Sequence, residues 1–141
     1  MAEPLHAAPV HPEPGRAAPL YYVDRSDIRE GRLEDVRNGM RDLAEFVEAR
    51  EPQLIAYQFY IDETESTMTL VAVHPDSASL EFHMELGGEK FRAFAAFIRM
   101  RSIDVYGRPS PAAVDQLRRK AEMLGGGTVT VHTRQAGFTR P

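Results

Sequence analysis

The order of the predicted elements indicates an α+β fold, with a ferredoxin-like βαββαβ core around an antiparallel sheet and a C-terminal αβ extension. Three observations predict this fold. Apolar runs of strand length alternate with longer segments whose apolar residues recur every three or four positions. Two of the runs are joined by only four polar residues, ETES, which suits an antiparallel hairpin. A further helix and strand follow the second βαβ unit.

The chain divides into a tail, residues 1–19, and a single domain, residues 20–141. The tail is rich in Ala and Pro. Such a composition cannot bury enough apolar surface to offset the entropy lost on folding, so we expect the tail to be disordered. The length that remains suits one hydrophobic core.

The first predicted strand, LYYVDRSDI (residues 20–28), is rich in aromatic and branched side chains. A long amphipathic helix follows within residues 30–52, and Pro52 ends it. The apolar stripe of this helix consists of Leu33, Val36, Met40, Leu43 and Val47.

The next two strands, residues 53–62 and 67–75, are predicted neighbours because only ETES separates them. In LIAYQFYI both alternating sets of side chains are largely apolar, whereas a strand with one wetted face alternates apolar with polar residues. Helices can cover one face of the sheet. We therefore expect the other face to pack on a second copy of the sheet in a homodimer.

The second crossover begins after Pro75, with Asp76 or Ser77 placed to cap a helix. Gly87 and Gly88 interrupt the pattern, which predicts two short helices with a bend at the glycine pair, the second over residues 89–100. SIDVYG (residues 102–107) is the strand that follows.

The C-terminal extension starts with Ser110 as N-cap and Pro111 in the first turn. The glycines of GGG end this helix, and TVTVHTR is a last strand. The helix has an apolar stripe, and Arg118–Lys120 is expected to lie on its solvated face. The stripe consists of Val114, Leu117, Ala121 and Leu124.

Composition excludes several classes of function. The formal net charge of -4 opposes attraction to phosphate, so nucleic acid is not an expected partner. The absence of cysteine rules out disulfides, thiolate nucleophiles and cysteine-ligated metals. No apolar run reaches membrane-spanning length, and we expect a cytoplasmic protein without a membrane partner.

His83 is the polar residue of greatest interest. Helical geometry places its imidazole toward the predicted sheet rather than toward water. One interpretation is a core histidine that a backbone carbonyl satisfies. The other is a general base or a substrate-binding group in a semi-buried pocket. His74 and His132 lack recognisable metal-ligand spacing to His83, so no metal site is predicted.

The segment FYIDETESTMTLVAVHPDSASLEFHMELGGEKF resembles the central signature of the antibiotic biosynthesis monooxygenase (ABM) family of dimeric α/β-barrel proteins. In that family a strand carries Glu and then Trp, and a helical His follows about nine positions later. Here Ala72 stands at the Glu position and His74 at the Trp position, and His83 stands at the expected His position. The Gly87–Gly88 region replaces a second family His.

The resemblance implies oxygenation of a phenolic, quinol or anthrone-like substrate without metal, flavin, haem or other cofactor. His83 would then be the catalytic residue, as base or as orienting donor. The candidate substrate-binding residues are Tyr22, Tyr57, His74, Met84 and Phe94. Two other classes stay open on the same fold: a non-redox aromatic polyketide cyclase or isomerase, and a non-catalytic ligand-binding or assembly domain.

Overall fold

The computed structural model describes residues 18–140 of the chain. The predicted disordered tail, residues 1–19, therefore lies outside the described residues except for its last two positions. No helix within residues 18–140 is long and apolar enough to cross a membrane.

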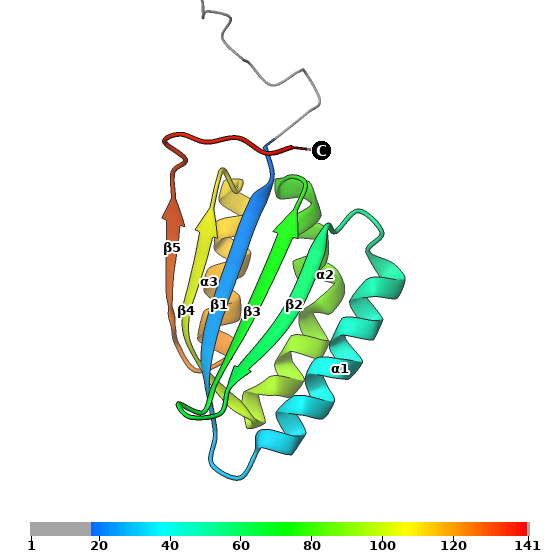
Figure 1. Ribbon diagram of the computed structural model, residues 1–141, viewed down its shortest axis with the longest axis vertical. Coiled ribbons are helices and arrows are strands. Elements are labelled where there is room, and N and C mark those ends of the chain that lie inside the picture. The colour runs from blue at the N-terminus through cyan, green and yellow to red at the C-terminus, as the bar shows by residue number, and fades with distance from the viewer. Residues whose placement is uncertain (1–17, 141) are drawn as a thin grey trace, which may run out of the picture.

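Five strands and three helices alternate along the described chain (Figure 1). They are β1 (Leu20–Ile28), α1 (Leu33–Arg50), β2 (Ala56–Asp62), β3 (Thr67–His74), α2 (Ser77–Ala93), β4 (Ile98–Tyr106), α3 (Pro111–Met123) and β5 (Thr128–His132). The sheet order is β2-β3-β1-β4-β5. The first four strands pair antiparallel, and β5 joins β4 in parallel. This confirms the α+β fold with a ferredoxin-like core and a C-terminal αβ extension.

All three helices lie on one face of the sheet (Figure 1). In β1 every second side chain is buried beneath them, from Leu20 through Tyr22, Asp24 and Ser26 to Ile28. A central strand covered on one face is expected to alternate in this way. Three of its five inward side chains, Tyr22, Asp24 and Ser26, carry a hydroxyl or a carboxyl group, so the middle of the core is polar.

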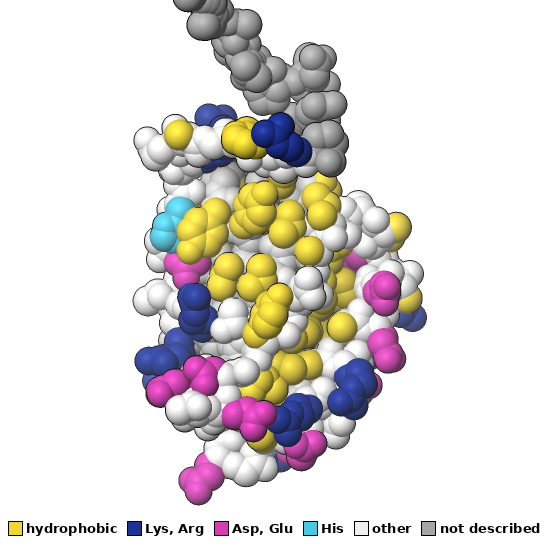
Figure 2. All heavy atoms as spheres, in the orientation of Figure 1, with side chains coloured by type: hydrophobic (Ala, Val, Ile, Leu, Met, Phe, Trp, Pro, Cys, Tyr) yellow, Lys and Arg dark blue, Asp and Glu magenta, His cyan; other side chains and the backbone are white. Residues whose placement is uncertain are grey.

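The other face of the sheet has no helix of residues 18–140 over it and carries an apolar patch. Figure 2 shows hydrophobic side chains gathered on this face. Strand alternation and the pairing register place the following residues there: Tyr21, Val23, Tyr60, Val71, Val73 and Tyr106. Tyr60 is 53% exposed. We call this set the open face; within the single chain the sheet is not closed into a barrel.

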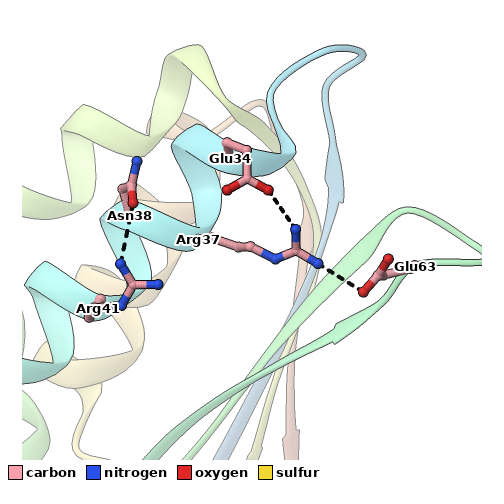
Figure 3. A network of polar contacts seen from close by, with 5 residues as sticks. All are labelled: Glu34, Arg37, Asn38, Arg41 and Glu63. Carbon is pink, nitrogen blue, oxygen red and sulfur yellow. Dashed lines mark hydrogen bonds and ion pairs between the residues drawn. The ribbon is translucent and has the colours of Figure 1, made fainter.

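An exposed ion-pair network links α1 to the hairpin that joins β2 to β3. Arg37 contacts Glu34 one turn earlier at 2.5 Å and reaches Glu63 in the hairpin at 2.8 Å (Figure 3). Exposed pairs of this kind contribute roughly 0–1 kcal/mol each, so the core decides the position of α1.

The predicted break at the glycine pair is wrong, because α2 runs without interruption from Ser77 to Ala93. Glycine in a helix costs only about 1 kcal/mol, which packing readily overrides. The Phe91 ring lies against the backbone of Gly87, where a Cβ atom would overlap it, while a Cβ on Gly88 would have open space around it. Gly87 therefore admits an aromatic side chain to the core.

The helix predicted over residues 89–100 also ends too late. A 3₁₀ turn, Phe94–Ala96, follows α2, and β4 already begins at Ile98. Ile98 and Met100 are both buried and lie two residues apart, which is the period of a strand, and Ile98 pairs with Ile28 of β1. The pairing with β1 outweighs the helical propensity of these residues. The first strand of the hairpin, β2, likewise starts at Ala56, later than the predicted residue 53.

The two glycines give opposite predictions for stability. Gly87→Ala should lower the free energy of unfolding by about 1–3 kcal/mol, because the new methyl group overpacks the Phe91 ring. Gly88→Ala should raise it by about 0.5–1 kcal/mol through better helix propensity. Urea unfolding of the two variants measures both values. Equal effects of the two substitutions would contradict the packing described for Phe91.

Candidate functional site

His83 lies in the core and forms a pair with Glu51. The side chain is 3% exposed, and its Nδ1 atom is 2.7 Å from Oε2 of Glu51, the buried residue that follows α1. A carboxylate can only accept hydrogen bonds, so Nδ1 donates and the lone pair of the neutral ring is on Nε2. Glu51 thus fixes which ring nitrogen can take up a proton.

Burial lowers the pKa of His83 below its usual value, and the nearby Glu51 opposes this shift only in part. The imidazole is therefore neutral at neutral pH. A neutral imidazole whose tautomer is set by a carboxylate has the chemistry of a general base.

Three rings surround the imidazole of His83. The ring centroids of Tyr57, His74 and Phe91 lie 5.2, 5.5 and 5.1 Å away. His74 is itself bonded through Nδ1 to Ser79 Oγ at 2.8 Å. Burial lowers the pKa of His74 to about 3, and the neighbouring His83 and Lys120 add to the effect. His74 is therefore a second neutral imidazole.

A second buried group joins the C-terminal extension to the central strand. Lys120 of α3 places its Nζ atom 2.7 Å from the hydroxyl of Tyr22 and 3.3 Å from Oδ2 of Asp24. Tyr22 donates to the same carboxylate oxygen at 2.5 Å. The ammonium also lies over the rings of Tyr22 and Phe91, 4.9 and 4.5 Å from their centroids.

The prediction that Lys120 lies on a solvated helix face is wrong, because its side chain is only 5% exposed. Lys120 stands three residues after Leu117 and four before Leu124, so it belongs to the inward stripe of α3. Val114, which was predicted in that stripe, is only half-buried, and Ala113 is buried instead.

Burial shifts the pKa values of this second group toward the uncharged forms. It lowers the pKa of Lys120, against the opposing effect of Asp24. It raises the pKa of Tyr22, with a further contribution from Asp24, and raises the pKa of Tyr57, with contributions from Asp24 and Glu51. Both tyrosines therefore keep their phenolic protons at neutral pH.

A small cavity of about 20 Å³ lies beside these groups. Three polar residues, Asp24, Tyr57 and Lys120, line it together with apolar side chains from all layers of the fold. The apolar lining consists of Leu43, Phe59, Met68, Leu70, Phe91, Phe94, Ile98, Met100 and Leu124.

Several buried polar atoms around the cavity and His83 have no hydrogen-bond partner within residues 18–140. They include Asp24 Oδ1, Glu51 Oε1, the Tyr57 hydroxyl and His74 Nε2. An unsatisfied buried group costs about 1–3 kcal/mol, and native proteins carry few of them. Four such atoms in neighbouring residues indicate a place where another molecule supplies the partners.

The sequence prediction named part of this region. The structure brings Tyr57 and His74 against His83, places Tyr22 beside Asp24 and Lys120, and puts Phe94 in the cavity wall. Met84 is buried but does not line the cavity. His132 bonds Asp104 at 2.8 Å and stacks on Tyr106, whose place is on the open face, so His132 does not join His83.

Three polar residues of this region were not identified from the sequence. The inward position of Asp24 could have been predicted, because strand alternation puts it on the same side of β1 as Tyr22 and Ser26. Lys120 was available from the helical spacing of α3. Glu51 carried no local signal, since its partner is 32 residues away in the sequence. Within residues 18–140 no three His, Cys, Asp or Glu side chains are grouped closely enough to hold a metal ion.

Comparisons with family models and with curated protein sequences find no match. Solved structures do match. MupZ from Pseudomonas fluorescens is 18% identical with a TM-score of 0.68, over 88% of this chain and 96% of that one. A conserved protein from Methanosarcina mazei Go1 is 18% identical with a TM-score of 0.57, over 67% and 96%. An antibiotic biosynthesis monooxygenase is 22% identical with a TM-score of 0.52, over 61% and 92%.

These likenesses show the fold. The chain has the fold of the antibiotic biosynthesis monooxygenase structure, as the sequence resemblance predicted. The MupZ match covers 88% of the chain, and residues 1–106 are a smaller share than this. The match therefore includes residues of the C-terminal extension, the segment to which Lys120 belongs.

The neutral state of His74 predicts a pH-dependent stability. The folded protein holds the pKa of His74 at about 3, whereas the unfolded chain takes up a proton near the ordinary value of 6.5. Stability is thus complete above pH 6.5 and falls as the pH drops toward 3. His74→Asn, which retains a polar atom for Ser79, should lower the slope of unfolding free energy against pH by up to about 1.4 kcal/mol per unit.

Urea unfolding of the parent and the variant between about pH 6.5 and 5 measures this slope above most carboxylate titration. His83 is present in both proteins, so its own contribution cancels. Identical slopes would show that His74 titrates in the folded protein as it does in the unfolded chain.

Proposed function

We propose that this chain is a cofactor-independent monooxygenase that oxidises a small phenolic, quinol or anthrone-like substrate. The observation that carries the proposal is the group of partnerless polar atoms around His83 and the cavity, within a wall that is otherwise apolar. Polar atoms left unsatisfied in a native core are rare, and a catalytic role is one of the physical reasons for keeping them. The monooxygenase named among the structural matches supports the proposal through its fold.

His83 is the base in this proposal. Its Nε2 atom takes a proton from the acidic C–H or O–H group of the substrate, and Glu51 stabilises the imidazolium that forms. The rings of Tyr57, Phe91 and Phe94 surround the aromatic part of the substrate. The hydroxyl of Tyr57 donates to the substrate oxygen.

The oxidation step is balanced without a cofactor. The substrate anion gives electrons to dioxygen and forms a C–O bond to it, and the resulting peroxide takes up one proton. Loss of water from a CH–OOH group then leaves a carbonyl, so that one oxygen atom stays in the product and the other leaves as water. The protein supplies the base and excludes bulk water.

The substrate ring needs more room than the cavity has. About 150 Å³ accommodates benzene in an apolar cavity, whereas this cavity holds about 20 Å³. Tyr57 and Phe59 are half-buried side chains of the edge strand β2, so we expect their movement to open a place for the ring beside the cavity. Substrate binding and rearrangement of β2 side chains are then a single event.

Two alternatives each rest on one observation. The Lys120 ammonium beside the cavity suits a cyclase or isomerase, because it would stabilise an enolate without any oxidation. The small cavity volume suits a non-catalytic ligand-binding or assembly domain. Oxygen uptake and product formation, measured together, separate the three functions.

The catalytic test uses His83→Asn. Asn retains a donor for Glu51 but removes Nε2, so stability should stay near that of the parent while turnover falls by roughly 100-fold or more. An oxygen electrode measures uptake with a panel of quinols and anthrones. His83→Ala, which leaves Glu51 without its partner, should in contrast cost about 1–3 kcal/mol of unfolding free energy.

Each outcome of this panel selects a function. Uptake that depends on Nε2 supports the oxygenase. Product formed without uptake supports the cyclase or isomerase, and binding without product supports the inert domain. Uptake at the parent rate by a stable His83→Asn protein would remove His83 from the mechanism.

We also propose that the protein is a homodimer that packs open face against open face. Apolar patches of this kind on a sheet are expected to meet a partner, and a two-fold axis lets the same patch serve both copies. Val71→Lys, in the middle of the open face, should convert the dimer to a monomer in light scattering. Phe82→Lys, which replaces a 44% exposed side chain on α2, is the control and should not. A monomeric parent protein at micromolar concentration would refute the dimer.

A further inference from the structure

We propose that the cavity is the dioxygen site of this protein. This inference rests on the proposed function, which requires dioxygen as second substrate and does not say where it binds. The cavity, its apolar wall and its polar residues each point to the same small molecule.

The volume of the cavity matches one small molecule. A volume of about 20 Å³ is close to the 10–15 Å³ that one water-sized probe needs, so the cavity holds one small molecule and no aromatic ring. Dioxygen is a molecule of this size. The aromatic substrate therefore lies beside the cavity and not within it.

The wall of the cavity is mainly apolar. Most of its lining is hydrocarbon or thioether, contributed by helix α1, strands β3 and β4 and the end of α2. Dioxygen is apolar and gains from leaving water, so the hydrocarbon part of the wall suits it. The apolar part of the lining includes Leu43, Met68 and Met100.

The polar residues of the wall can form hydrogen bonds with the reduced forms of oxygen. The ammonium of Lys120 has three N–H donors, of which Tyr22 and Asp24 take two within the described residues. The Tyr57 hydroxyl has no partner and offers a second donor. Asp24 Oδ1, also without a partner, can accept from a peroxide O–H group. Dioxygen itself needs none of these groups, whereas superoxide needs the donors and a protonated peroxide needs both kinds.

The reaction that follows is balanced. The deprotonated substrate transfers one electron to dioxygen, which gives superoxide and a substrate radical. The two combine into a C–O bond, and the terminal peroxide oxygen takes the proton that His83 had removed. Tyr57 lines the cavity and also lies 5.2 Å from His83 between ring centroids, so this proton has a short path.

The experiment is methionine-methyl NMR of the full chain under dioxygen pressure. Dioxygen is paramagnetic and speeds the relaxation of methyl groups close to it. Met68 and Met100 line the cavity, while Met40 and Met84 are buried elsewhere and serve as internal controls. We expect the relaxation enhancement at Met68 and Met100 to be several-fold larger than at Met40 and Met84. Equal enhancement at all four methyl groups would overturn the proposal and indicate a cavity that water fills.

A filled cavity provides the second measurement. Leu43→Phe adds volume at the lining and should abolish the extra enhancement at Met68 and Met100. An enhancement that persists in the folded variant would place dioxygen elsewhere and overturn the proposal. If the variant fails to fold, the comparison of the four methyl groups in the parent protein decides alone.

The outcome is separable from that of the proposed function. Selective enhancement without oxygen uptake on any substrate would refute the oxygenase and leave a gas-binding cavity. Oxygen uptake without selective enhancement would support the oxygenase and refute this site.

Discussion

The buried ion pair of Asp24 with Lys120 constrains the whole interior. Removing a charge from water costs several kcal/mol even after relaxation, so each of these groups needs the other in the core. Asp24 belongs to the central strand and Lys120 to the C-terminal extension, and the pair therefore fixes α3 over β1. The extension is a structural part of the core, because it supplies the cation that pairs with Asp24 among residues 18–140.

The same constraint gives the interior its chemistry. One oxygen of the Asp24 carboxylate accepts from Tyr22 and Lys120, and the other has no partner within residues 18–140. Glu51 behaves in the same way toward His83. A core of this composition gives up stability that hydrocarbon side chains would supply. It gains a neutral imidazole, two protonated tyrosines and an ammonium within an apolar wall, which together can remove a proton and stabilise an anion.

Local signals in the sequence were enough for most of the fold, because each depends on neighbours in the chain. The ETES hairpin and the Ser110 cap fall where predicted, and Ser110 accepts from the backbone of Ala113 as an N-cap should. The break predicted at the glycine pair was wrong, because Gly87 is needed to leave room for the Phe91 ring and does not end the helix. His83 was found through its inward spacing and a family resemblance. Its partner Glu51 was not, since nothing near Glu51 in the sequence distinguishes it from the other charged residues of that helix end.

A double-mutant cycle on Asp24→Asn and Lys120→Met tests most directly whether this pair organises the interior. Each single substitution should lower the free energy of unfolding by about 3–5 kcal/mol, because it leaves the remaining group buried without its partner. The double variant should lose clearly less than the sum, with a coupling of about 1–3 kcal/mol. Losses that add to within about 0.5 kcal/mol would show that the two groups are independent and would contradict the account.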